Sequence, residues 1–151
     1  MPRRTLVVLA VMVALFLSGC VMPGRAPMVL ADSDGYTVIS PCGDPISTIE
    51  VRKSLDPTAT EPYWSAEAHV ESAATRIRLF SSPAGYASTP VASAMDPRGE
   101  YIVWINGVST GTVLVPGELK PGRGIWFSES FDVANLAKEQ KRVADRVCGP
   151  A

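Results

Sequence analysis

Residues 107–111 (Gly-Val-Ser-Thr-Gly) have the spacing of the G-x-S-x-G motif, in which a sharp turn between a strand and a helix exposes a nucleophilic serine. The residues that follow, 112–115, are Thr-Val-Leu-Val, and this run favours a second strand rather than a helix. In the hydrolases that carry this motif, the catalytic histidine follows the serine in the chain. His69, the single histidine here, instead precedes Ser109. We therefore interpret the motif as a glycine-rich hairpin and predict no catalytic serine.

His69 stands between two acids, Glu67 and Glu71, at a spacing that places all three on one face of a strand. Such a set could hold a divalent metal. Arg76 and Arg78 are expected on the same face of a neighbouring strand, where they would neutralise the carboxylates. With one histidine and no free thiol expected, a closed zinc site is hard to assemble. We predict no metal and no other cofactor.

The first 20 residues have the three parts of an export signal. Arg3 and Arg4 precede an apolar run of about a dozen residues at 6–17, and small residues follow it at 18–20. A helix that crosses the hydrocarbon layer needs about 20 apolar residues, so a permanent membrane anchor is the weaker interpretation of this run.

The segment Leu17-Ser18-Gly19-Cys20 resembles the lipobox of bacterial lipoproteins. The resemblance implies that residues 1–19 are removed and that the Cys20 sulfur receives a diacylglyceryl group, with palmitate among the attached chains. It further implies a protein held on the extracytoplasmic face of the cell membrane, where two acyl chains anchor stably and one barely does. The resemblance covers these 20 residues and implies nothing about the domain after them.

Two cysteines remain if Cys20 carries lipid, namely Cys42 and Cys148. An even pair in an oxidising compartment is typical of a disulfide, and two buried thiols are the alternative. We predict the disulfide, which would join the start of the folded domain to its end.

Removal of residues 1–19 takes away two arginines and no acid, which changes the formal net charge from −1 to −3. A mildly acidic chain without a basic block makes nucleic acid an unexpected partner. Residues 20–35 carry Pro, Gly and Asp without sustained periodicity and are predicted to be a lipidated tether. Residues 36–151 suit one exported domain.

The pattern of this domain is mostly that of strands. Residues 63–71 alternate strictly, with Trp64, Ala66, Ala68 and Val70 on one face, and residues 75–80 alternate again. We predict that these two segments form an antiparallel hairpin. Further strands are expected at 36–39, 46–53, 100–105, 112–115 and 125–131; Asn106-Gly107 would form a tight turn, and the last two strands would pair around 116–124.

The C-terminal segment changes to helical spacing, with Asp132 as a cap at its start and Gly149-Pro150 at its end. Short strands followed by one helix predict a mainly β fold, an antiparallel β-sandwich that is immunoglobulin-like in architecture with one C-terminal α-helix. Trp64, Trp104 and Trp126 lie within strands and are expected to pack in the core.

Two loops are candidates for recognition. Residues 81–99 contain Tyr86 and Met95, and residues 116–124 contain Lys120 and Arg123. Long loops without secondary structure are uncommon and are either functional or disordered, so a solvated connection is the alternative.

Taken together, the sequence predicts a non-enzymatic binding module tethered to the cell envelope, which recognises an envelope protein or polymer. A hydrolase whose carboxylates meet only in the fold is one alternative. A small-ligand carrier is the other, and it would require an enclosed apolar cavity.

Overall fold

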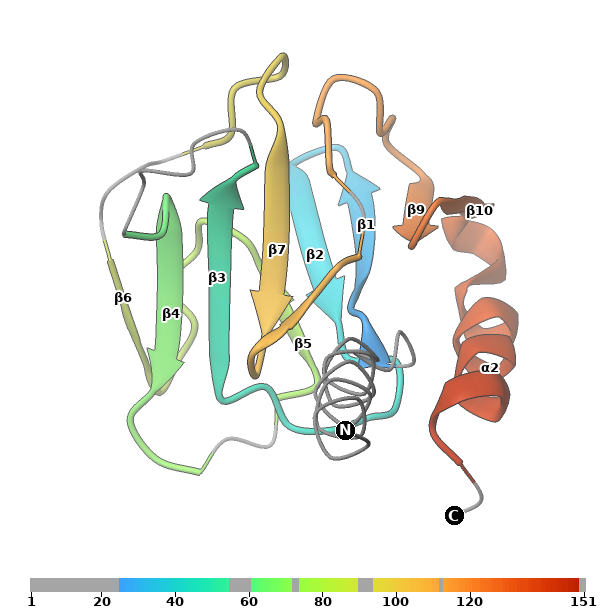
Figure 1. The fold of residues 1–151 in the computed structure, drawn as a ribbon, viewed down its shortest axis with the longest axis horizontal. Helices are drawn as coiled ribbons and strands as arrows, with labels where there is room; N and C mark the ends of the chain where they lie inside the picture. Colours follow the sequence, from blue (N-terminus) through green and yellow to red (C-terminus); the bar gives the residue numbers. More distant parts are fainter. Residues whose placement is uncertain (1–24, 55–60, 72–73, 90–93, 112, 150–151) are drawn as a thin grey trace, which may run out of the picture.

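The computed structural model describes residues 25–54, 61–71, 74–89, 94–111 and 113–149 of the 151-residue chain. These residues form two five-stranded antiparallel sheets and a C-terminal helix (Figure 1). Sheet A has the strand order β10-β9-β1-β2-β5, and sheet B has the order β6-β4-β3-β7-β8. The predicted antiparallel β-sandwich with one C-terminal helix is confirmed.

The strands are short and are numbered in the order in which they occur along the chain. Sheet A consists of β1 (Met28–Asp32), β2 (Gly35–Ile39), β5 (Arg76–Arg78), β9 (Arg123–Trp126) and β10 (Glu129–Asp132). Sheet B consists of β3 (Thr48–Lys53), β4 (Trp64–Ala68), β6 (Tyr86–Ser88), β7 (Tyr101–Ile105) and β8 (Val108–Ser109). The helix α2 (Leu136–Val147) follows the 3₁₀ turn η2 (Val133–Asn135).

Sheet A is the middle layer of the molecule because both of its faces are buried. One face packs against sheet B, and this core includes Val29 and Ala31 of β1 together with Val51 and Val103 of sheet B. The other face packs against α2, through a second cluster that consists of Met28, Leu30, Ile39, Trp126, Phe131 and Val143. Successive residues of β1 therefore enter opposite cores, as expected for a strand with two covered faces.

β1 corrects the prediction of a tether that extends to residue 35. Ala26 is 2% exposed and Met28 is fully buried, so the folded domain includes them. The run Met-Val-Leu-Ala shows no alternation because both faces of the strand are buried, so this strand gives no period-two signal in the sequence. Residues 20–24 of the predicted tether lie outside the described residues.

The predicted hairpin of residues 63–71 and 75–80 is wrong, although a strand lies in each segment. β4 pairs with β3 and β6, whereas β5 pairs with β2 in the other sheet. Arg78 contacts Asp32 at 3.1 Å rather than a carboxylate of β4, and Val70 is 73% exposed beyond the end of β4. The connection has no dipeptide that specifies a tight turn, and it crosses between the sheets.

Residues 112–115 and 125–131 do not pair either, which corrects a second prediction. β9 and β10 form a hairpin with each other around Phe127 and Ser128. Phe127 has a φ of 52°, a conformation that sequence rules assign to Gly or Asn, so the turn gives no signal in the sequence. Leu114 instead forms an isolated bridge to Tyr101, and Thr112 lies outside the described residues.

Three local predictions are confirmed. Asn106 and Gly107 have φ values of 47° and 79° and form the tight turn between β7 and β8. The Asp132 carboxylate accepts a hydrogen bond from the Ala134 amide at 2.8 Å, and the chain after the helix turns at Gly149 with a φ of 75°. Cys42 and Cys148 form the disulfide, which joins the loop after β2 to the end of α2. Among the described residues, no helix is long and apolar enough to cross a membrane.

Candidate functional site

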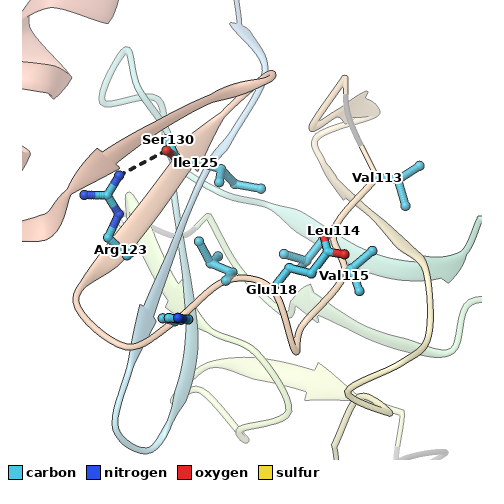
Figure 2. Close-up of a pocket in the computed structure, with 9 residues that line it drawn as sticks. Val113, Leu114, Val115, Glu118, Arg123, Ile125 and Ser130 are labelled. Atoms are coloured by element: carbon cyan, nitrogen blue, oxygen red, sulfur yellow. Dashed lines mark hydrogen bonds between the residues drawn. The ribbon is translucent and has the colours of Figure 1, made fainter.

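A pocket of about 360 Å³ lies between the segment 113–120 and the hairpin of β9 and β10 (Figure 2). It occupies the side of sheet A that faces sheet B, at the position where the segment 113–120 crosses from one sheet to the other. Its lining combines apolar and polar side chains: Val113, Leu114, Val115, Glu118, Leu119, Lys120, Arg123, Ile125 and Ser130. The volume lies within the range of about 300–1,000 Å³ that small-ligand pockets occupy.

The segment that forms one wall is fixed by backbone contacts along its length. Leu114 exchanges two hydrogen bonds with Tyr101 of β7, at 2.7 and 2.9 Å. The Gly117 amide donates to the Pro97 carbonyl at 2.8 Å, and the Gly122 amide donates to the Ala31 carbonyl at 2.9 Å. Because these bonds reach both sheets, the wall is preformed and no ligand is needed to order it.

A tyrosine side chain also holds this wall. The Tyr36 hydroxyl donates to the Pro116 carbonyl at 2.7 Å. Burial raises the pKa of Tyr36, because the charged phenolate is poorly solvated there, so the hydroxyl keeps the proton that it donates.

The opposite wall is the hairpin of β9 and β10. Ser130 and Ile125 are paired in register, and both side chains point into the pocket, while the side chains of Trp126 and Phe131 pack on the α2 side. The Arg123 guanidinium donates from Nη2 to the Ser130 Oγ at 3.0 Å (Figure 2). This bond directs the arginine toward the outer edge of the hairpin.

The charged groups of the pocket are not paired with opposite charges among the residues that the structure describes. Within the described part of the chain, no ion pair shorter than 4 Å includes Glu118, Lys120 or Arg123. Glu118 and Arg123 stand on opposite walls (Figure 2). Asp132 shares a face with Arg123, but its carboxylate caps the Ala134 amide. Lys120 and Arg123 are therefore available to an anionic group and Glu118 to a hydrogen-bond donor.

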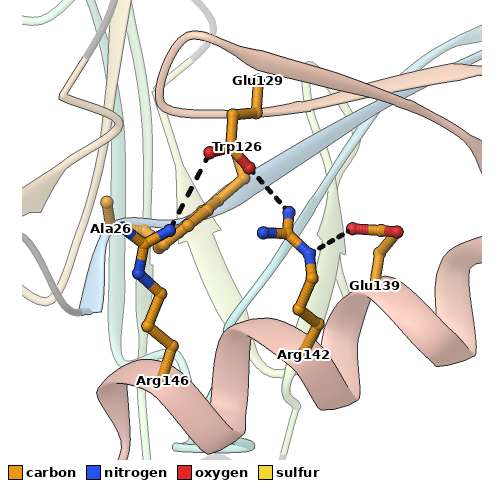
Figure 3. A network of polar contacts seen from close by, with 6 residues as sticks. All are labelled: Ala26, Trp126, Glu129, Glu139, Arg142 and Arg146. Atoms are coloured by element: carbon orange, nitrogen blue, oxygen red, sulfur yellow. Dashed lines mark hydrogen bonds and ion pairs between the residues drawn. The ribbon is translucent and has the colours of Figure 1, made fainter.

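A second polar network lies on the other face of sheet A, and its charged side chains, unlike those of the pocket, form ion pairs with one another (Figure 3). Arg142 donates to Glu129 and to Glu139, each at 2.7 Å, and these hydrogen bonds raise the pKa of its guanidinium. Arg142 and Arg146 also lie over the Trp126 ring, at 6.0 and 5.7 Å from its centroid. These contacts hold α2 on sheet A, so we assign this network to packing rather than to recognition.

The structure separates the four predicted recognition residues into two pairs. Lys120 and Arg123 line the same pocket, as a recognition role requires. Tyr86 and Met95 are 9% and 8% exposed and belong to the main core, so the proposal that they present a recognition surface is wrong. The segment 81–99 is also not a long unstructured loop, because it contains β6; its residues 90–93 lie outside the described part.

The other candidate residues are located on turns and strand ends. Ser109 lies in β8, directly after the tight turn, which agrees with the interpretation of the motif as a hairpin. His69 is exposed just beyond β4. In the part of the chain that the structure describes, no three side chains of His, Cys, Asp or Glu converge on a point where a metal would bind.

The tryptophan predictions are confirmed for two of three residues. Trp64 and Trp126 are 2% and 4% exposed, and each belongs to a core cluster. Trp104 is half-buried, because it lies on the outer face of sheet B, opposite Glu50. The strand β7 is apolar on both faces although the described residues cover its outer face only in part, which is why the sequence indicated a core position.

Sequence reasoning missed Glu118, Ile125 and Ser130, which complete the pocket. One signal was present: the segment 113–119 is apolar at four positions and has a glutamate among them, which is unusual for a solvated loop. Comparison with models of known protein families, with curated proteins and with solved structures found no match.

Proposed function

We propose that this protein is a lipid-anchored binding module of the bacterial cell envelope and that it binds its partner in the pocket between 113–120 and the β9–β10 hairpin. One observation carries the proposal. Two cations, Lys120 and Arg123, lack ion-pair partners in the described structure and stand beside apolar side chains in a preformed pocket.

The pocket has the composition of a recognition site. Apolar residues such as Leu119 and Ile125 provide surface that a ligand can remove from water, and a few polar groups fix its orientation. A carboxylate of the ligand would form charge-assisted hydrogen bonds with Arg123, which are stronger than bonds between neutral groups. Because the walls are already ordered, binding costs little conformational entropy.

The alternatives fit the pocket less well. General acid–base hydrolysis needs a positioned acid and a positioned base, and the described lining offers one carboxyl group, Glu118, and neither His nor Cys. A carrier of apolar ligands needs an enclosed apolar cavity, whereas this pocket is open and has three charged residues in its lining. The binding module therefore agrees best with the side chains present.

The anchor is the second part of the proposal. We propose that lipid on Cys20 holds the protein on the extracytoplasmic face of the membrane, supported by the export signal and the lipobox of residues 17–20. Ala26 is already buried, so few residues separate the proposed lipid from the folded domain. In cells supplied with labelled palmitate, the wild-type protein should take up label and the Cys20→Ala variant should not. Equal labelling of both proteins would refute the anchor.

A matched pair of variants tests the pocket. Full-length protein would be immobilised and used to capture partners from solubilised envelope of the source organism. The double variant Lys120→Ala, Arg123→Ala should lose a partner that the wild-type protein retains and that free protein competes away. The control Arg98→Ala, Lys138→Ala changes the net charge equally at two exposed positions outside the pocket, and it should retain the partner. Equal capture by both variants would exclude the pocket as the binding site.

A further inference from the structure

β10 is an edge strand, and it borders the pocket. In sheet A it has one strand neighbour among the described strands, β9. Its residues Glu129, Ser130 and Asp132 are exposed, and only Phe131 is buried. An edge strand with exposed backbone is a template on which a further strand can pair. The pocket and this edge therefore form one continuous surface at Ser130.

The register of the hairpin shows which backbone groups point to the edge. The turn between β9 and β10 has two residues, and Trp126 pairs with Glu129 across it. In an antiparallel pair closed by such a turn, the closing residues exchange both hydrogen bonds and the next pair exchanges none. Ser130 and Ile125 are that next pair. The Ser130 amide and carbonyl are thus directed away from β9, toward the open edge.

Side chains of the pocket reach the same edge. A residue paired with Ser130 from outside would share its face, with the two Cβ atoms about 5 Å apart. The Arg123 guanidinium is already 3.0 Å from the Ser130 Oγ, so it lies next to that position. The Arg123 amide donates to the Lys120 carbonyl at 3.1 Å, which keeps the second cation in the same turn.

We propose, on the basis of the binding function proposed above, that the partner is an extended peptide segment that adds to β10 as a further strand and places an acidic side chain against Arg123 and Lys120. The outward amide and carbonyl of Ser130 match the donor and acceptor of a peptide backbone. The cations match the acidic side chain, and Glu118 on the opposite wall accepts a donor from the same segment. Strand addition of this kind takes its affinity from backbone bonds and its specificity from side-chain pockets.

A defined peptide tests the proposal on the full-length chain in detergent. The probe is Thr-Val-Thr-Asp-Thr-Val-Thr, blocked at both ends, in which the aspartate and both valines share one face of a strand. With the ¹⁵N-labelled protein and peptide up to about 5 mM, where millimolar affinity is still measurable, we expect shifts of the Ser130 and Arg123 amide signals. No shift at either amide would overturn the proposal.

Two changes in the peptide separate the contributions of backbone and charge. In an antiparallel addition with the aspartate opposite Ser130, N-methylation of the aspartate removes the amide that pairs with Ser130, whereas N-methylation of the preceding threonine alters an amide that points away. The first should weaken binding by about tenfold or more, and the second should not. Replacement of the aspartate by asparagine should also weaken binding by about tenfold. Equal binding of the two methylated peptides, or of the Asp and Asn peptides, would refute the peptide strand.

A pair of protein variants gives the complementary test. Ser130→Pro removes the outward amide at a position where proline is tolerated, since edge strands accept it. Ser130→Ala keeps the amide and removes the hydroxyl that accepts from Arg123. Peptide binding should be weaker in the proline variant than in the alanine variant, because both lose the hydroxyl and only the proline variant loses the outward amide; if the proline variant does not fold, the methylated peptides still decide. Envelope capture that depends on Lys120 and Arg123, without any of these peptide effects, would leave the binding function standing and overturn this inference alone.

Discussion

The disulfide between Cys42 and Cys148 should be the largest single contribution to the stability of the fold. The two residues are 106 positions apart, so the bridge closes most of the domain into one loop. In the chain-entropy model, a closed loop of this length restricts the unfolded chain by about 4–5 kcal/mol. Since small domains are stable by only about 5–15 kcal/mol, the double variant Cys42→Ser, Cys148→Ser should fold with little stability remaining.

The native structure should nevertheless survive the loss of the bridge. The side chain of Val143 is fully buried in the second core, and Arg142 binds Glu129 at 2.7 Å. These contacts of α2 with sheet A do not involve either cysteine. The bridge therefore acts mainly on the unfolded state, and helix content and tryptophan environment should be those of the wild type until the chain unfolds.

Guanidinium unfolding, followed in parallel by helical circular dichroism and tryptophan fluorescence, measures the effect. Both signals should change together, at a much lower denaturant concentration than in the wild type. Cys20→Ala is the matched control, because it removes a cysteine outside the bridge and should not shift the midpoint. A loss below about 1 kcal/mol would refute the entropic reasoning. Helical signal lost ahead of tryptophan fluorescence would show instead that the bridge, and not the packing, holds α2.

Three further predictions follow from the packing and the buried hydroxyl groups. Val143→Ala removes two methyl groups from a fully buried site and should cost about 2 kcal/mol in urea unfolding; an unchanged midpoint would contradict the docking of α2. Gly124→Ala would place a Cβ 2.3 Å from the Phe131 ring, and it should cost at least about 1 kcal/mol or displace the ring, visible as altered near-ultraviolet circular dichroism. Burial raises the pKa of Tyr101, so the folded state holds that proton more tightly than the unfolded state, and stability should decline as the pH rises above the ordinary tyrosine value of 10.0. Tyr101→Phe should reduce this alkaline decline in unfolding experiments, and an undiminished slope would assign it to another group.

Predictions from the sequence succeeded where the signal is local. The helix repeats its apolar positions at a helical spacing, Asp132 caps the 3₁₀ turn that leads into it, and the chain turns at Gly149 after it. The Asn106-Gly107 turn requires two residues that tolerate a positive φ, and few residue types do. The disulfide prediction followed from counting, because the predicted lipidation of one of the three cysteines leaves a single pair.

Pairing between strands was the part that could not be inferred. Alternation located β4 and β5 correctly, but it says nothing about which strand lies beside which. Two segments separated by a short link resemble a hairpin whether the link turns back within one sheet or crosses to the other. Here Ile77 packs beside Val38 in sheet A, and Trp64 lies opposite Val51 in sheet B.

The candidate site was inferred only in part for the same reason. Lys120 and Arg123 are recognisable as charges in a Gly/Pro-rich loop. Ser130 and Ile125 enter the pocket through the register of β9 and β10, which depends on a turn at Phe127 that lacks the usual residues. For Tyr86 the error is the reverse, because a core residue was assigned to recognition. Its segment looks irregular in the sequence, but the large apolar surface of a tyrosine side chain favours burial.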